Sequence, residues 1–201
     1  MENHLEGLPK YGVTLSGSPL NPVIENHSGR TVIAYMLIAA GQNGCGPVYQ
    51  ILLTTTMQPA GIPDGGSLYA IGAMPINRPG PMQSPASARI VSPGHGPIVS
   101  ATLQSVVFAD GQFLGADEHG VFELFGRRIK VIVDVGLLAK AGAWDQLEPL
   151  ALSPGSPLGP PADFERRSIA TLLVHERRFK GDDAADELAK IFSSLPAPWR
   201  H

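Results

Sequence analysis

Three residues in the first part of the chain could do chemistry: Cys45 in "GQNGCGP", His95 in "SPGHGP" and Asp110 in "VVFADGQFLGADEHG". A cysteine nucleophile needs a nearby base, and a helix N-terminus that favours its thiolate. The residues after Cys45 predict a strand instead of a helix, and His95 is the only obvious base. We therefore assign no catalytic residue, and we keep a small hydrolase with a loop site around His95, Cys45 or Asp110 as the alternative function.

Patterns that bind metals or phosphates do not occur in the sequence. The six histidines form no HxH or HExxH pair. The stretch that starts at Asp110 does not fit a calcium loop, because Leu114 and Val121 stand where oxygen ligands are needed. No GxSxG motif is present, and "GIPDGG" lacks the Lys and Ser or Thr of a phosphate loop. We expect no metal site and no cofactor.

Composition argues against several classes of partner. The chain has 201 residues and a formal net charge of -3, so it has no excess of positive charge for nucleic acid. The longest apolar run, Thr31 to Ala40, is half of the about 20 residues that a membrane-spanning helix needs, and it predicts a buried strand. The start "MENHLEGLPKYG" has neither a basic nor an apolar block. We expect a cytoplasmic protein, or an exported one whose signal has been removed.

The density of charge changes near residue 116. Residues 1–116 carry 4 Lys or Arg and 5 Asp or Glu, whereas the remaining 85 residues carry 11 and 13. The first part is also rich in Gly, Pro and β-branched residues, which is typical of short strands separated by turns. We therefore predict a β-domain over 1–116 and a helical extension over 117–201.

Six strands are expected in the first part. They cover about 11–17, 22–26, 30–40, 47–57, 87–92 and 98–109. In the turn "ENHSGRT", Asn26 and Ser28 supply side-chain acceptors and Gly29 supplies freedom of φ. This spacing predicts an immunoglobulin-like antiparallel β-sandwich, with a small barrel as the alternative.

The stretch around Asp110 is interpreted as a hairpin followed by a helix. Asp110 and Gly111 fit a two-residue type I′ turn that would place Phe108 opposite Phe113 and Val107 opposite Leu114. An apolar stripe with helical spacing follows, formed by Phe122, Phe125, Ile129, Ile132, Val133 and Leu137. We predict a helix capped by Asp117 that runs to about Lys140, although the β-branched residues of 129–135 leave a strand as the alternative.

Two further helices are expected near the end of the sequence. Asp163 caps the first, over 164–180, which ends at Gly181. The second starts at Asp182 or Asp183, which makes about three helices in all. If these helices stood free, they would expose a continuous apolar surface of Ile169, Leu172, Leu173, Phe179, Leu188, Phe192 and Leu195.

The turn and strand "ENHSGRTVIAY", followed by "SVVFADGQFLGAD" and a helical tail, resemble uncharacterised bacterial proteins with an immunoglobulin-like domain. The resemblance implies the α+β fold, and it implies no activity and no catalytic residues.

The function expected from the sequence is a non-enzymatic binding or structural module that acts through protein–protein contacts. The apolar faces from about Asp163 onward need a cover. We expect the same chain to cover them, with contact to another protein or to a second copy in a homodimer as the alternative.

Overall fold

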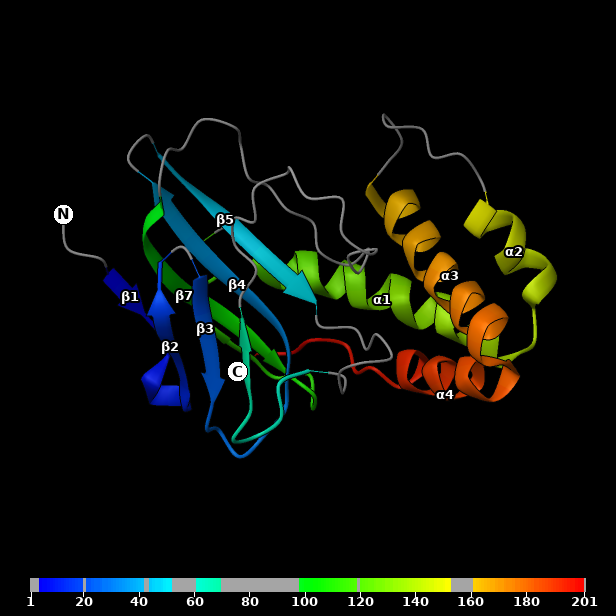
Figure 1. Cartoon of the computed structure of the whole chain (residues 1–201), viewed down its shortest axis with the longest axis horizontal. Coiled ribbons are helices and arrows are strands. Elements are labelled where there is room, and N and C mark those ends of the chain that lie inside the picture. Colours follow the sequence, from blue (N-terminus) through cyan, green and yellow to red (C-terminus); the bar gives the residue numbers. More distant parts are fainter. Residues whose placement is uncertain are drawn as a thin grey trace. The chain divides into compact units, whose positions relative to one another are not determined.

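The structure is a computed structural model that describes residues 4–19, 21–41, 44–51, 61–69, 98–118, 120–152 and 161–200. It is a mixed α+β protein in which the strands precede the helices, as the sequence predicted (Figure 1). The chain divides into two compact units, which we call the β unit (residues 1–121 and 199–201) and the helical unit (residues 122–198).

Two sheets form the β unit. The strands are β1 (His4–Glu6), β2 (Val13–Ser18), β3 (Asn21–Asn26), β4 (Val32–Gly41), β5 (Gly44–Ile51), β6 (Ser67–Tyr69), β7 (Ile98–Phe108) and β8 (Phe113–Gly115). The larger sheet has the order β1-β7-β4-β5 with β8 also on β7, and the smaller has the order β2-β3-β6. Every pair is antiparallel except β1 with β7, which is parallel. Among the described strands, neither sheet closes into a barrel.

The two sheets share one hydrophobic core. Its members come from both sheets and include Val13 of β2, Ile24 of β3, Tyr35 and Leu37 of β4, and Leu103 of β7. Tyr35 is fully buried, and this burial raises the pKa of its hydroxyl above the ordinary value.

The apolar run in β4 is the buried strand that the sequence predicted. Each residue from Val32 to Leu37 is at most 3% exposed, so side chains on both faces of this strand are buried. Four further predicted strands correspond to β2, β3, β5 and β7. The one expected at 87–92 lies outside the described residues. The short strands β1 and β6 were not expected from the sequence.

The segment that could have been helix or strand is a helix, α1 (Val121–Lys140). Phe125, Ile129 and Ile132 are buried as predicted, but Leu137, expected on the same stripe, is 49% exposed. The cap expected at Asp117 is wrong, because α1 begins four residues later, directly after Gly120 with its φ of 63°.

Three more helices follow in the described chain, α2 (Trp144–Leu152), α3 (Pro161–Lys180) and α4 (Asp182–Ser193). The sequence predicted no helix at α2, because its second half falls in a proline-rich stretch and Pro149 lies inside it. Leu147 of α2 is fully buried, and α2 packs on α3. Helix α3 begins before Asp163, and Gly181 separates it from α4 as predicted.

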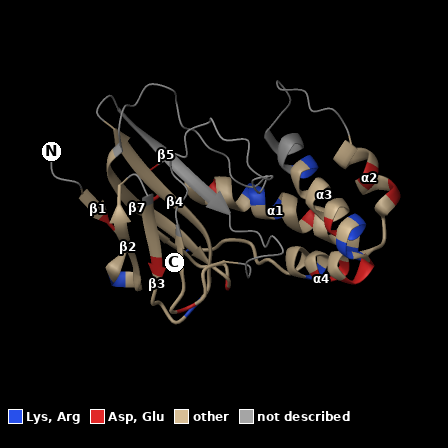
Figure 2. Cartoon of the chain, viewed as in Figure 1, with Lys and Arg blue, Asp and Glu red and all other residues tan. Residues whose placement is uncertain are grey.

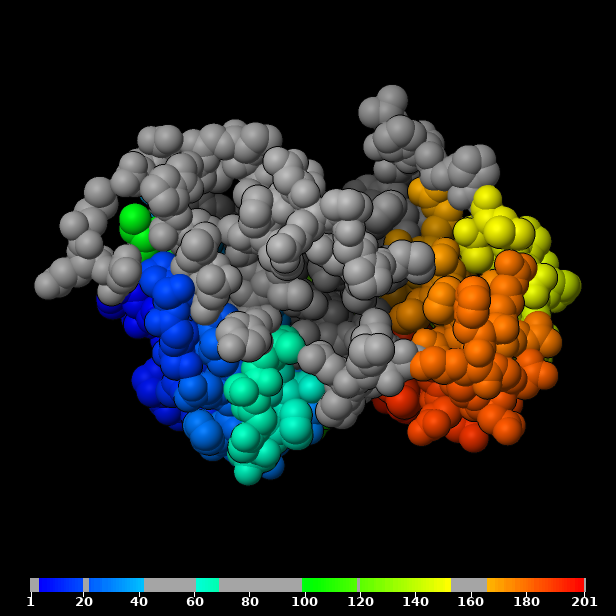
Figure 3. Space-filling model, viewed as in Figure 1, coloured from blue at the N-terminus to red at the C-terminus, as the bar shows by residue number. Residues whose placement is uncertain are grey.

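Helices α2, α3 and α4 pack together, and Figure 3 shows their surfaces meeting. Most of the apolar face expected on α3 and α4 is buried within the chain, including Ile169, Leu173, Leu188 and Phe192. A close approach between α1 and α4 occurs at Gly136. A β-carbon on that residue would lie 2.7 Å from the Phe192 β-carbon and 2.8 Å from the Ser193 nitrogen.

We expect Gly136→Ala to lower the free energy of unfolding by about 1 to 3 kcal/mol, because the added methyl group forces α4 away from α1. The matched control is Gly126→Ala in the same helix, where a β-carbon meets nothing within 4 Å. There the gain in helix propensity should stabilise the chain by about 0.5 to 1 kcal/mol. Urea denaturation of both variants measures the difference, and a stabilising Gly136→Ala would contradict the close packing.

Candidate functional site

The hairpin between β7 and β8 has a three-residue loop, Ala109–Gly111. Gly111 has a φ of 87°, its nitrogen donates to the Phe108 oxygen at 2.8 Å, and the Phe108 nitrogen donates to the Gln112 oxygen at 3.0 Å. Such a loop consists of a tight turn followed by a left-handed residue.

The predicted two-residue turn is therefore wrong by one residue in register. Val107 lies opposite Phe113, and Val106 lies opposite Leu114. Asp-Gly suits both loop lengths, because each needs a glycine with positive φ.

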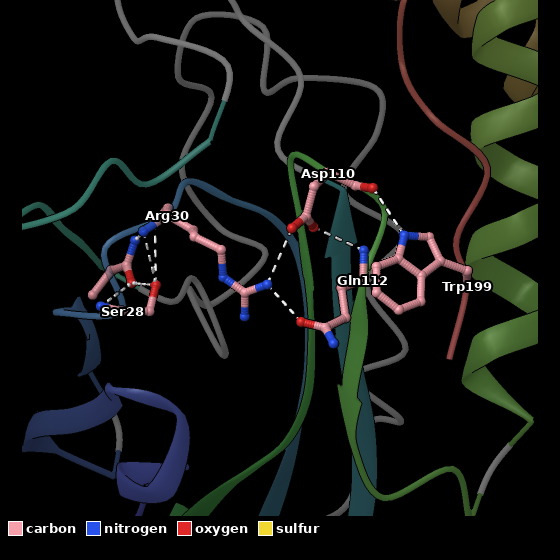
Figure 4. Close-up of polar contacts among 6 residues, drawn as sticks. Ser28, Arg30, Asp110, Gln112 and Trp199 are labelled. Carbon is pink, nitrogen blue, oxygen red and sulfur yellow. Dashed lines mark hydrogen bonds and ion pairs between the residues drawn. The ribbon is translucent and has the colours of Figure 1, made fainter. Parts of the chain in front are cut away.

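Asp110 lies at the tip of this hairpin, and both of its carboxylate oxygens accept hydrogen bonds (Figure 4). Oδ1 accepts from the Gln112 nitrogen at 2.9 Å, and Oδ2 accepts from Arg30 Nη1 at 3.1 Å. The contact with Gln112 stabilises the turn, and the contact with Arg30 ties the turn to another part of the unit.

Arg30 reaches the hairpin from the turn between β3 and β4. Its guanidinium lies 3.7 Å from the centre of the Phe108 ring, and Nη1 donates to Gln112 Oε1 at 2.5 Å. A guanidinium over an aromatic face is attracted by the ring electrons, and burial strengthens the attraction. Arg30 therefore links two turns that are 80 residues apart in sequence.

Asn26 fixes the turn that carries Arg30. The side chain is fully buried, and Nδ2 donates to the Arg30 oxygen at 2.6 Å and to the Ile62 oxygen at 2.7 Å. Its Oδ1 accepts from the Ser28 nitrogen at 3.1 Å, which is the local bond predicted from "ENHSGRT". The bond to Ile62 crosses 36 residues, and no local pattern in the sequence indicates it.

Trp199 pairs with the other edge of the same hairpin. Its nitrogen donates to the Gly111 oxygen and its oxygen accepts from the Phe113 nitrogen, both at 2.8 Å, which makes a parallel bridge to Gln112. The indole Nε1 donates to the main-chain carbonyl oxygen of Asp110 at 3.0 Å (Figure 4). Arg200, the next residue, pairs with Asp117 at 2.8 Å. We call the hairpin residues that hold this segment, Asp110, Gly111, Phe113 and Asp117, the hairpin site.

The other residues considered from the sequence are placed as follows. Cys45 lies in β5 opposite Ala40. His95 lies outside the described residues, and so does any contact of His95 with Cys45 or Asp110, on which a hydrolase depends. The residues that the structure describes hold no group of three or more His, Cys, Asp or Glu suited to a metal ion. No described helix is long and apolar enough to cross a membrane.

A second candidate surface lies on the helical unit, whose helices carry most of the blue and red ribbon that marks Lys, Arg, Asp and Glu in Figure 2. At the end of α3, the Phe179 ring is 73% exposed and packs against the His175 ring at 4.3 Å. Leu152 at the end of α2 is 66% exposed. The end of α2 lies near Thr171, because Thr171 Oγ1 donates to the Ala151 main-chain oxygen at 3.4 Å, so Phe179 alone defines this candidate surface.

Arg177 joins three helices beside that surface. Its guanidinium lies 4.5 Å from the centre of the Trp144 ring, and it forms ion pairs with Glu148 at 3.8 Å and Asp182 at 2.7 Å. Trp144 is thus a packing partner of Arg177. The mixed charges of these helices pair with one another, as in Lys180 with Glu176.

Comparison with protein-family models, with curated proteins and with solved structures found no match to this chain. Its function is therefore inferred from the hairpin site and from the exposed end of α3.

We expect Asp110→Ala to lower the free energy of unfolding by about 1 kcal/mol, because the turn loses the bond to the Gln112 nitrogen and the pairing with Arg30. Asp110→Asn keeps an oxygen acceptor for the Gln112 nitrogen, so this variant should lose less of the free energy of unfolding. Urea denaturation of the two variants compares the two losses. Wild-type stability in Asp110→Ala would contradict a structural role for this carboxylate.

Proposed function

We propose that the chain is a non-enzymatic protein-binding module in which the β unit is an immunoglobulin-like sandwich and the helical unit carries the docking surface. Support for the sandwich comes from the two sheets, which share one core. Support for the docking surface comes from Phe179.

The exposure of Phe179 is the observation that carries the proposal. The other apolar residues expected on this surface are largely buried, as Ile169 and Leu173 illustrate, while Phe179 remains 73% exposed. Burying a phenylalanine side chain contributes roughly 1.5 to 3 kcal/mol, which favours a contact that covers it. His175 extends the ring surface, because its own ring packs on Phe179.

The partner that we propose is a second copy of this chain. Charges of both signs lie next to Phe179 in the sequence, with Arg178 at the end of α3 and Asp183 at the start of α4. Two copies related by a twofold axis would place the basic group of one against the acidic group of the other, with the phenylalanines between them.

We expect Phe179→Ser to weaken self-association of the full chain at least about tenfold, equivalent to about 1.4 kcal/mol, because the apolar contact at the centre is lost. Sedimentation over a range of concentrations measures the association. Thermal stability should stay near that of the wild type, since the side chain is exposed.

The matched control is Leu137→Ser, another exposed apolar residue of the helical unit, on α1, that has no part in the proposed contact. It should retain most of the association. A wild-type chain with the mass of one copy at every concentration would contradict the self-association that we propose.

A further inference from the structure

We propose that the hairpin site is a docking site for an extended segment in which tryptophan is followed by arginine, and that Trp199 and Arg200 of a second copy can occupy it in place of the chain's own. The chain fills the site with its own segment, so the contacts show what the site recognises. This inference concerns the β unit and does not depend on Phe179.

Main-chain contacts make the site a place for strand addition. The Gly111 oxygen and the Phe113 nitrogen are directed at the same residue, Trp199, and both of its main-chain groups are paired at 2.8 Å. An extended peptide that adds to the edge of a sheet gains its affinity from bonds of this kind. Any extended residue could make them, so they give no preference for a sequence.

Side-chain contacts supply the preference for tryptophan followed by arginine. The indole Nε1 donates to the main-chain carbonyl oxygen of Asp110 at 3.0 Å, a bond that phenylalanine cannot make. Arg200 reaches Asp117 at 2.8 Å, and the Asp117 side chain is the less exposed of the two, at 22% against 54%. A segment with an acidic residue at the second position would meet Asp117 with like charge.

The segment held in this site is in a position to exchange. Trp199 stays 39% exposed, and residues 195–198, which lead to it, belong to no helix or strand. A short linker of this kind holds its segment at an effective concentration of the order of 1 mM. The chain's own segment therefore fills the site in dilute solution. The segment of a second copy fills it when the contacts of the chain's own segment are weakened.

The first experiment uses the full chain with Trp199→Ala and a fluorescein-labelled peptide of residues 194–200, "SLPAPWR". By fluorescence anisotropy, the peptide should bind this variant at least about tenfold more tightly than it binds the wild-type chain, whose own segment competes. Adding Asp117→Arg to the variant should weaken binding, because the arginine of the peptide is then repelled. Equal binding to the variant and the wild type, or no binding to either, would overturn the proposal.

A charge exchange tests occupancy by a second copy. Within a chain that carries Asp117→Arg, two arginines face each other, and within a chain that carries Arg200→Asp, two aspartates face each other. If the two chains exchange their final segments, each hairpin site instead receives a residue of opposite charge. An equimolar mixture should show the mass of two chains by light scattering at millimolar concentration. One chain that carries both substitutions restores its own pairing and should show the mass of one.

All chains in this mixture also carry Phe179→Ser, so that association through α3 does not contribute. A mixture that keeps the mass of one chain, while the doubly substituted chain is folded by circular dichroism, would overturn occupancy by a second copy. Failure of this experiment leaves the association through Phe179 standing, and the converse also holds.

Discussion

The left-handed backbone at Gly111 is the constraint on which this end of the β unit depends. With a φ of 87° at this residue, the loop closes over three residues and the Gly111 nitrogen turns back to the Phe108 oxygen. The Asp110 carboxylate can then reach the Gln112 nitrogen, and the Gly111 oxygen points outward to Trp199. A residue with a β-carbon would be strained there, so the hairpin site requires glycine.

Arg30 extends this constraint to the other side of the hairpin. Its ion pair with Asp110 alone would contribute little, since the Asp110 side chain is exposed to water and the Arg30 side chain is about one-third exposed. Stacking on Phe108 and the bond to Gln112 restrict the guanidinium to one place, so less side-chain entropy is lost in forming the ion pair. Buried Asn26 in turn fixes the backbone that carries Arg30.

The sequence predicted the order of strands and helices because the periods of its apolar residues change from about two to about 3.6 near residue 116. It failed where two local structures fit the same residues. Asp110 and Gly111 suit loops of two and of three residues, and the pairing with Trp199, 89 residues from Asp110, favours the longer one. Pro149 argued against α2, whose packing on α3 was not visible in the local pattern. Asp117 looked like a helix cap but pairs with Arg200, 83 residues away.

The contacts of Trp199 and Arg200 also decide how the helical unit is connected. The chain leaves the β unit after β8 and returns to it at Trp199, so the helical unit is held at both ends. Asp117 lies on the segment that leaves the β unit and Arg200 lies on the segment that returns to it. Their ion pair holds these two segments together. The contacts that fill the hairpin site are therefore the same contacts that fasten the returning end of the chain to the β unit.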